Sequence, residues 1–433
     1  MIDPAFDDGD AADVEETGEP LETAKPASPL EVRPVPRISI QAFCESPDLA
    51  ETIEAIADDR RMSRTHIKVH TGGLAAAVEF YQESATPNLI IVESSLGRST
   101  LNAELDRLAD VCDPGTKVVV VGHVNDVELY RDLIRRGISE YMIAPVEGLG
   151  LISAIGGLYA DKSAAPLGRS IAFIGGKGGV GSSTVSHNVA WAIARNFESD
   201  VVVADLDLAF GTAGLDFNQD PPQGIAEAIN APERLDDIFL DRLLARCTDH
   251  LSLLASPAML DRTYDFDEAT FAQVIEVAQA GVPALILDLP HEWTAWVRGT
   301  LMAADEVVLT VEPDLGNLRN AKNMIDLLRQ TRKNDLPPRL VVNKVGMAKR
   351  PEIATNDFAE ALGLTPDAII SCDPQLFGTA ANNGQMIAET DAKSPVVEAF
   401  NTIARVVTGR SETKRVKHSA LAPFLSRFRG KSA

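Results

Sequence analysis

The fold is decided by a short glycine-rich stretch, Gly176-Lys177-Gly178-Gly179-Val180-Gly181-Ser182-Ser183-Thr184. It follows the apolar segment SIAFIG and precedes VSHNVAWAIAR, whose apolar residues recur with the period of a helix. The backbone N–H groups of such a turn and the positive end of the next helix together hold an anion. The spacing GxxxxG followed by hydroxyl residues therefore predicts a phosphate-binding loop. A turn that only lets a strand and a helix pack closely is the alternative.

The loop departs from the commonest phosphate-binding pattern at one position. The pattern GxxxxGK[ST] requires lysine at the sixth step after Gly176, where this chain has Ser182. Losing a lysine contact to phosphate costs on the order of 1.5 to 3 kcal/mol, or about ten- to a hundred-fold in affinity. We therefore expect nucleotide binding to survive and fast turnover to be lost. A lysine does occur earlier in the loop, at Lys177.

The early lysine and the glycines make the loop resemble the deviant Walker A loop, KGGxGK[ST], of the ParA/MinD superfamily of ATPases. The resemblance implies that ATP and Mg²⁺ are the cofactors and that two copies of the chain form a homodimer around the nucleotide. Lys177 then has a catalytic role, because it reaches the phosphates bound by the partner copy. Ser183 is the hydroxyl that ligates magnesium. The resemblance also assigns nucleotide contacts to the rest of the loop: Gly176, Gly178, Gly179, Val180, Gly181, Ser182 and Thr184.

Acidic and amide residues follow later apolar segments in the order of the superfamily's motifs: VVVADLDLAFG, ALILDLP and LVVNKV. The resemblance implies that Asp207 orients the attacking water. It places Asp205 in the outer magnesium shell and makes Asp288 a Walker B carboxylate that holds magnesium through water. It also implies that Asn343 hydrogen-bonds the adenine, which the segment around Pro374 covers. A single aspartate at a strand end is otherwise a turn residue or a helix cap.

The chain is long enough for two or three domains, because it has 433 residues. Short apolar runs alternate with helix-period segments from Ile38 onward, and the alternation restarts after a polar segment. We therefore predict an α/β fold with two doubly wound parallel-sheet domains. Resemblance to known families implies that the first is a receiver-like, flavodoxin-type domain and the second a phosphate-loop domain of the ParA/MinD type. The predicted boundaries are 38–160 and 170–408 for the domains, 161–169 for a linker, and 1–37 and 409–433 for disordered tails.

The charge of the chain limits its partners. The 40 basic and 63 acidic residues give a net charge of -23, which repels nucleic acid and makes DNA an improbable partner. The four cysteines are too scattered for a zinc knuckle or a CxxC pair, and no apolar stretch approaches the ~18 residues of a membrane helix. These features favour a cytoplasmic protein.

The first predicted domain resembles a response-regulator receiver that has lost its chemistry. A receiver needs an acceptor aspartate after the third strand, a hydroxyl after the fourth and a lysine after the fifth. This chain has Glu93, Gly122-His123 and Ala144 at those places. We therefore interpret it as a docking or dimerisation domain; a phosphorelay adaptor is the alternative.

Within the superfamily, the chain resembles the CpaE/TadZ group of pilus-assembly ATPase-like proteins. The resemblance rests on GGKGGVGSSTVSHNVAWAIA, DLDLAFGTAGLDFNQDP, DLPHEWTAW and DPQLFGTAANNGQMI. A small residue in place of the loop lysine is typical of that group. The resemblance implies a polar localisation factor for the Flp (tight adherence) pilus, working with other pilus and secretion assembly proteins, with weak or absent hydrolysis. An active ParA/MinD-type ATPase that positions DNA or a membrane complex is the alternative.

The last 25 residues carry seven basic residues and one acidic residue. Leu421, Phe424, Leu425 and Phe428 fall at i, i+3, i+4 and i+7, which would form one apolar stripe beside a cationic face on a helix. Such a segment could attach the chain to the inner membrane surface. A solvated terminus or a segment that docks a protein partner is the alternative, since Pro423 interrupts the stripe.

Overall fold

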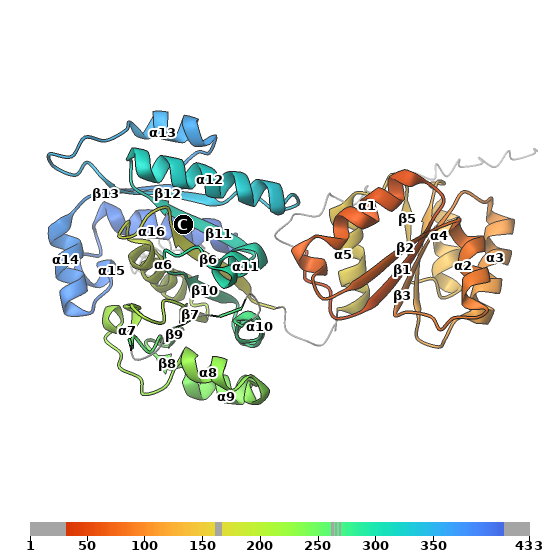
Figure 1. Ribbon diagram of the computed structural model, residues 1–433, viewed down its shortest axis with the longest axis horizontal. Helices are drawn as coiled ribbons and strands as arrows, with labels where there is room; N and C mark the ends of the chain where they lie inside the picture. Colours follow the sequence, from red (N-terminus) through yellow and green to blue (C-terminus); the bar gives the residue numbers. More distant parts are fainter. Residues whose placement is uncertain (1–31, 161–166, 261–263, 265, 268–269, 411–433) are drawn as a thin grey trace, which may run out of the picture.

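The computed structural model describes residues 32–160, 167–260, 264, 266–267 and 270–410. Two α/β units follow one another along the chain, each with a mainly parallel sheet covered by helices (Figure 1). This architecture confirms the predicted fold class. Most of both predicted tails, and residues 161–166 of the predicted linker, lie outside the described residues.

The first unit contains a five-stranded parallel sheet in the order β2-β1-β3-β4-β5. Its central strand β3 is buried at every residue, as expected when helices cover both faces. Its strands are β1 (Ser39–Cys44), β2 (His66–Thr71), β3 (Leu89–Ser94), β4 (Lys117–Gly122) and β5 (Glu140–Ile143). Its helices are α1 (Pro47–Ala57), the 3₁₀ turn η1 (Arg60–Met62), α2 (Gly73–Tyr81), α3 (Arg98–Val111), α4 (Val127–Arg135) and α5 (Gly148–Tyr159).

The end of the predicted acidic tail belongs to this first unit. Val32 and Val35 are buried in the same apolar cluster as β1, α1 and α5. The backbone N–H of Val35 donates to the carbonyl of Arg61 over 2.8 Å. The prediction of a tail up to Arg37 is therefore corrected for residues 32–37, because two isolated valines in a proline-rich segment give no periodic pattern in the sequence.

The second unit contains an eight-stranded sheet in the order β13-β12-β11-β6-β10-β7-β9-β8. All neighbours are parallel except β8 and β9. Its strands are β6 (Arg169–Gly175), β7 (Val201–Asp205), β8 (Ala245–Arg246), β9 (Leu251–Leu254), β10 (Ala284–Asp288), β11 (Glu306–Val311), β12 (Arg339–Val345) and β13 (Ala368–Ser371). Six strands, β6, β7, β9, β10, β11 and β12, match the predicted apolar runs, whereas β8 and β13 at the two edges were not predicted.

Two apolar layers sandwich this second sheet because successive strand residues point to opposite faces. Ile171 and Phe173 of β6 pack on one side with α6 and α16, and Ala172 and Ile174 pack on the other with α10, α11 and α12. The helices are α6 (Ser182–Phe197), α7 (Ala213–Asp216), α8 (Ile225–Asn230), the 3₁₀ turn η2 (Pro232–Arg234), α9 (Asp237–Leu243), α10 (Ala272–Gly281), α11 (Ala295–Ala303), α12 (Leu315–Thr331), α13 (Thr355–Leu362), α14 (Pro374–Asn383), α15 (Ile387–Thr390) and α16 (Pro395–Thr408).

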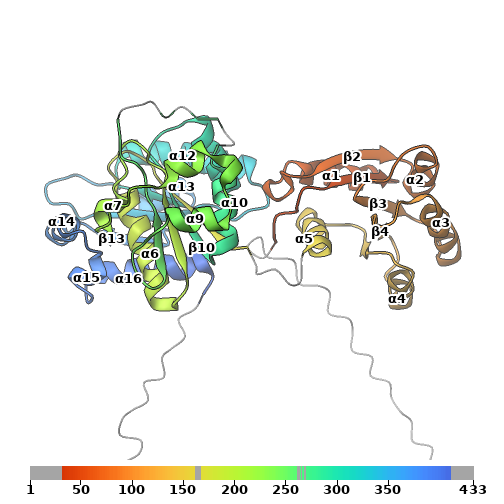
Figure 2. The same ribbon diagram turned by 90° about the horizontal axis from the view of Figure 1, so that it is seen from below.

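The two units meet over a small junction (Figure 1 and Figure 2). Arg60 of η1 donates from Nε to Asp335 over 2.8 Å and from Nη1 to Asp305 over 2.8 Å. The guanidinium of Arg61 is fully buried and contacts both Asp59 and Asp335. Because buried charges of this kind are costly unless paired, this ion cluster fixes how η1 sits against the turn after α12.

Candidate functional site: a phosphate loop at the end of β6

The glycine-rich stretch forms a loop between β6 and α6, as the sequence predicts. Gly179 and Gly181 adopt positive φ angles of 79° and 88°. A Cβ on Gly181 would lie 2.7 Å from Nδ2 of Asn343, so this position has no room for a larger residue. The loop and the residues after β7 and β10 line a cavity of about 400 Å³ that is open to solvent.

Lys177 stands at the exposed rim of this loop. Its side chain is 57% exposed, and Nζ lies 3.8 Å from the carboxylate of Asp314. Asp314 caps the N-terminus of α12 and accepts a hydrogen bond from the backbone of Asn317 over 2.8 Å. Burial raises the pKa of Asp314, but these hydrogen bonds and the charge of Lys177 outweigh it and lower the pKa. Lys177 is therefore held loosely, by one long ion pair.

A second lysine also contacts the loop. Lys344, at the end of β12, donates to the carbonyl of Gly179 and forms an ion pair of 2.9 Å with Glu312. Its charge is thus directed at a carbonyl and a carboxylate. Among the described residues that line the cavity, Lys177 is the only lysine or arginine.

Ser182 begins α6 at the place where the common pattern has lysine. It is 9% exposed, and among the described residues its Oγ has no hydrogen-bond partner. Ser183 follows on the first turn of α6 and also lines the cavity. Both serines and the N-terminus of α6 therefore lie at the cavity, which is an arrangement suited to a phosphate, although the Oγ of Ser182 is itself buried.

Asp205 and Asp288 lie side by side behind the loop, because they are register partners on β7 and β10. Asp205 is fully buried and accepts hydrogen bonds from the backbones of Asp207 over 3.1 Å and Ala213 over 3.2 Å. The hydroxyl of Ser256 donates to the same carboxylate over 3.0 Å. Burial, and then the charge of Asp288, raise the pKa of Asp205. Both of its oxygens are used inside the fold.

A buried histidine joins Asp288 to α7. His187 of α6 has Nδ1 at 2.7 Å from Asp216 and Nε2 at 3.3 Å from Asp288. Burial lowers the pKa of His187, but hydrogen bonds and charges of the two carboxylates outweigh it and raise the pKa to about 10. The imidazolium therefore neutralises part of the charge behind the loop. Among the described residues, the other oxygen of Asp288 has no hydrogen-bond partner.

Asp207 is the predicted carboxylate that faces the cavity. It lines the cavity beside the loop, and Oδ1 accepts a hydrogen bond from the backbone of Phe210 over 2.9 Å. Partial burial raises its pKa. This is a suitable position for a group that orients water next to a bound phosphate.

The two predicted adenine contacts lie differently. Asn343 is buried, and its amide donates to the carbonyl of Val180 over 2.8 Å, so it supports the loop backbone. Pro374 is exposed at the first residue of α14 and does not line the loop cavity. From the sequence, His291 is expected to contact a partner or pack in the core and is given no role in the loop site, but its Nδ1 lies 3.0 Å from the carbonyl of Gly175 at the cavity wall. Only its position shortly after the Asp288 motif could have indicated it.

Magnesium fits the site as an ion bound chiefly by the nucleotide. The described residues contain no group of three or more His, Cys, Asp or Glu that could hold a metal by themselves. However, the free oxygen of Asp288 and the hydroxyl of Ser182 are buried polar atoms without a partner there. Mg²⁺ keeps several waters and prefers one or two protein ligands plus phosphate oxygens. Ser183 and a water on Asp288 would complete such a set.

The acceptor place of the first unit is built differently. Oε2 of Glu93 accepts hydrogen bonds from the backbones of Glu45 and Ser46, each over 2.7 Å. Oε1 accepts one from the hydroxyl of Ser46 over 2.7 Å, and His123 lies 3.3 Å away. The carboxylate is thereby enclosed by the start of α1.

Comparisons with known proteins agree with this geometry. The family model of the CobQ/CobB/MinD/ParA nucleotide-binding domain matches residues 171–376. A solved pilus assembly protein CpaE from Caulobacter crescentus is 55% identical over the N-terminal part; the match covers 30% of this chain and 98% of that chain, with a TM-score of 0.29. The chain is a CpaE-type member of the ParA/MinD family.

Two other relatives of this CpaE-type chain each match a little more than half of it, a length similar to that of the second unit. The septum site-determining protein MinD of Bacillus subtilis is 26% identical over 259 residues, which are 57% of this chain and 91% of that protein. A ParA family ATPase from Chlorobium tepidum has a TM-score of 0.50 and 22% identity, covering 55% of this chain and 98% of that one. Among the described helices, none is long and apolar enough to cross a membrane.

Proposed function

We propose that this CpaE-type chain is an ATP-binding, dimerising localisation and assembly factor for Flp pilus biogenesis, with weak or absent ATP hydrolysis. The name of its Caulobacter relative supports the link to pilus assembly. The match to a nucleotide-binding family and the loop geometry support ATP with magnesium as the ligand. We further propose that it acts at a cell pole together with other pilus assembly proteins.

The observation that carries the proposal is the distribution of positive charge around the loop. Ser182 supplies no charge, Lys344 is occupied by Glu312, and Lys177 points outward with 57% of its side chain exposed. A triphosphate bound to one copy therefore has no lysine at position 182, and the only lysine of its own chain at the cavity is Lys177 on the exposed rim. We infer that Lys177 of a second copy, exposed and held by one long ion pair, supplies the missing charge. Nucleotide and dimer then stabilise each other.

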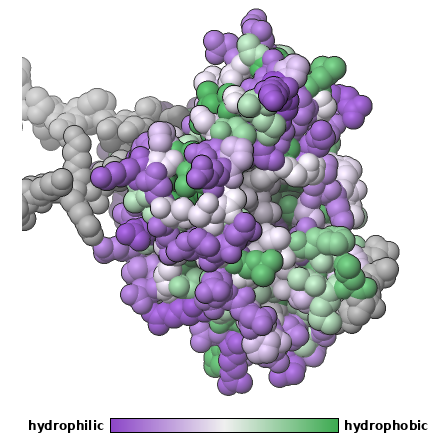
Figure 3. All heavy atoms as spheres, turned by 90° about the vertical axis from the view of Figure 1, so that its left-hand side faces the viewer, coloured by the Kyte–Doolittle hydropathy of each residue, from purple (hydrophilic) through white to green (hydrophobic). Residues whose placement is uncertain are grey.

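The surroundings of the cavity suit a face that a second copy covers. Phe210, Trp293 and Leu315 are 68%, 52% and 73% exposed. Phe210 lines the cavity, Trp293 lies two residues after His291, and Leu315 follows Asp314. Burying such side chains favours association, at about 25 cal/mol per Å² of apolar surface. The side of the second unit that Figure 3 shows also carries separate apolar patches among polar side chains.

Weak catalysis follows from two features of the same site. The loop lacks the lysine that neutralises the β and γ phosphates, and His187 already neutralises part of the carboxylate charge behind the loop. Transition-state charge on the transferred phosphoryl group is normally stabilised by such a lysine together with Mg²⁺. We infer that the chain works by holding nucleotide and that slow turnover, if present, only resets the dimer.

The test measures nucleotide binding, phosphate release and mass in solution for the full chain and two variants. Lys177→Ala should keep the monomer fold but lose ATP-dependent dimerisation, whereas Ser182→Lys should bind ATP more tightly. Lys322→Ala is the matched control, because Lys322 is an exposed lysine on α12 paired with Asp326. Wild-type turnover as fast as that of an active ParA/MinD motor would overturn weak catalysis and favour the alternative of an active positioning ATPase.

The basic C-terminal residues are a separate part of the proposal, because residues 411–433 lie outside the described residues. We propose that residues 409–433 bind anionic lipid and make the chain peripheral to the inner membrane. Co-sedimentation with anionic liposomes should fall when the chain ends at Thr408. Unchanged pelleting would leave a protein partner as the function of this segment.

A further inference from the structure

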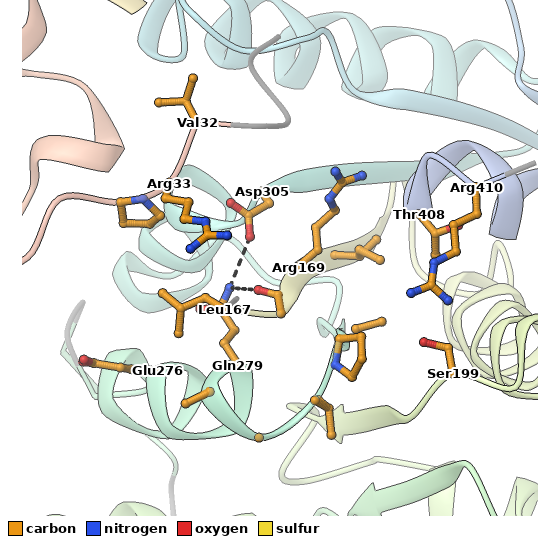
Figure 4. Close-up of a pocket in the computed structure, with 18 of the residues that line it drawn as sticks. Val32, Arg33, Leu167, Arg169, Ser199, Glu276, Gln279, Asp305, Thr408 and Arg410 are labelled. Atoms are coloured by element: carbon orange, nitrogen blue, oxygen red, sulfur yellow. Dashed lines mark hydrogen bonds between the residues drawn. The ribbon is translucent and has the colours of Figure 1, made fainter. Parts of the chain in front are cut away.

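A second cavity lies at the junction of the two units, at the opposite end of β6 from the phosphate loop. Its volume is about 650 Å³, which is in the range of small-molecule sites. Val32, Arg33, Pro34 and Arg64 come from the first unit, and the remaining lining residues come from the second (Figure 4). Arg169, at the start of β6, lies in its wall, whereas the phosphate loop follows Gly175 at the end of that strand.

The lining of this junction cavity is basic, although the whole chain carries a net charge of -23. It contains four arginines, Arg33, Arg64, Arg169 and Arg410, and two acids, Glu276 and Asp305, so that four minus two gives a local charge of +2. Such a concentration of positive charge in an acidic protein attracts anions.

Both acids already have partners inside the fold. Glu276 pairs with Arg64 over 2.6 Å, and Asp305 pairs with Arg60 over 2.8 Å. Asp305 also accepts a hydrogen bond of 3.1 Å from the side chain of Gln279, which donates to the carbonyl of Gly168 as well (Figure 4). Among the described residues, these acids therefore form no ion pair with Arg33 or Arg410.

Two arginines are exposed at this cavity without an ion pair in the part of the chain that the structure describes. They are Arg33 and Arg410, and they lie on opposite sides of the cavity (Figure 4). The lining is mixed: it includes the apolar Leu167, Ile171 and Val282 as well as the polar Ser199 and Gln279. The junction that shapes the cavity is fixed by the buried ion cluster around Arg61.

We propose that this junction cavity binds a phosphomonoester of nucleotide size. A phosphomonoester carries a charge of about -1.5 to -2 at neutral pH, which matches the local charge of +2. Arginine is the side chain best suited to phosphate, because its planar donors match two oxygens at once. The volume exceeds that of phosphate alone, so the organic part of the ligand would contact the apolar residues of this lining. Since residues of both units line the cavity, the ligand would also stabilise their mutual arrangement.

The test is calorimetric titration of the full chain with uridine monophosphate and with uridine, which lacks the phosphate. The charge-reversed double variant Arg33→Glu/Arg410→Glu changes the local charge from +2 to -2. We expect it to weaken uridine monophosphate binding at least about tenfold. The matched control is Arg131→Glu, an exposed arginine on α4. Lys177→Ala, at the phosphate loop, should retain the affinity.

Four outcomes decide the proposal. A loss of affinity confined to the double variant, reproduced in weaker form by the neutral pair Arg33→Gln/Arg410→Gln, would support it. Equal affinity of wild type and double variant would overturn it, as would loss in Lys177→Ala alone, which would place the binding at the phosphate loop. Equal binding of uridine would show that phosphate is not recognised. The unfolding midpoint of each variant, compared with wild type, excludes a general loss of structure.

Discussion

The two units differ in whether the polar groups at the carboxyl ends of their strands are hydrogen-bonded within the fold. At the end of β3, Glu93 is buried, and both carboxylate oxygens accept hydrogen bonds from the chain's own Glu45 and Ser46. At the end of β6, by contrast, the loop surrounds an open cavity of about 400 Å³, and the hydroxyl of Ser182 has no partner among the described residues.

This contrast separates a structural site from a binding site. A buried polar group that the fold satisfies contributes stability and has nothing left to offer a ligand, whereas an unsatisfied one is stabilised when a ligand binds. The first unit therefore has the fold of a receiver with its acceptor place closed. The second unit leaves a cavity open beside its glycine-rich loop, where we propose that phosphate binds.

The largest effect is expected on the stability of the first unit when the carboxylate of Glu93 is removed. Glu93→Ala would leave the two backbone donors and the hydroxyl around α1 without their charged partner, so the first unit should lose about 3 kcal/mol of unfolding free energy. All three tryptophans lie in the second unit. Circular dichroism should therefore show earlier unfolding in urea while tryptophan fluorescence does not. Glu83→Gln, an exposed glutamate, is the control; equal unfolding of both variants would show that Glu93 is not structural.

A smaller effect is expected at the open site when its backbone is constrained. Gly181→Ala places a Cβ against Asn343 and at a φ of 88°, which costs on the order of 1 to 3 kcal/mol. Because the loop itself is strained, ATP affinity measured by calorimetry should fall more than the unfolding midpoint. Gly97→Ala, where a Cβ meets no atom within 4 Å, is the control. Undiminished ATP affinity would mean that the loop does not bind phosphate in this conformation.

A lysine at position 182 should raise the affinity for ATP, by an amount similar to or smaller than the loss expected for Gly181→Ala. Ser182→Lys adds a cation at the N-terminus of α6, so ATP affinity should rise about tenfold. A filter-binding or fluorescence titration measures it, with Ser182→Ala as the control for loss of the hydroxyl. If Ser182→Lys binds no better than wild type, the serine is not standing in the position of a phosphate lysine.

A smaller effect of Glu93 is expected on how the stability of the first unit depends on pH in acid. Burial raises the pKa of Glu93, but hydrogen bonds from Ser46 and Glu45 and the charge of His123 lower it below its ordinary value of 4.5. A carboxyl group with a lowered pKa stabilises the fold fully above its unfolded pKa and loses that contribution as the pH falls through the folded pKa. The urea concentration at which the first unit unfolds, measured by circular dichroism, should therefore fall below about pH 4.5. Glu93→Gln should make this midpoint less dependent on pH. An unchanged slope would contradict it.

The smallest expected effect is no effect at all. Incubation with a small phosphodonor and Mg²⁺ should add no stable phosphate to Glu93, because its oxygens are occupied and Ala144 stands where a receiver has lysine. Intact-mass measurement checks this. A stable added phosphate at Glu93 would reopen the phosphorelay alternative.

The sequence predicted features correctly where functional residue types lie next to apolar strand segments along the chain. The glycine loop, the apolar strands and the carboxylates at their ends could all be predicted, because each depends on neighbouring residues. The four-residue edge strand β13 was missed, although β9 of the same length was predicted, and the edge strand β8 could not be predicted because it has only two residues. Neither could the link from Asp216 through His187 to Asp288, which joins positions far apart in the sequence.

The measurement that tests the central idea most directly is the mass of the protein in solution with and without ATP and Mg²⁺, for wild type and Lys177→Ala. We expect wild type to shift from monomer to dimer when ATP is added, and Lys177→Ala to remain a monomer at concentrations at least about tenfold higher. A dimer of Lys177→Ala that forms with the same dependence on ATP would contradict the idea that the lysine of one copy binds the nucleotide of the other.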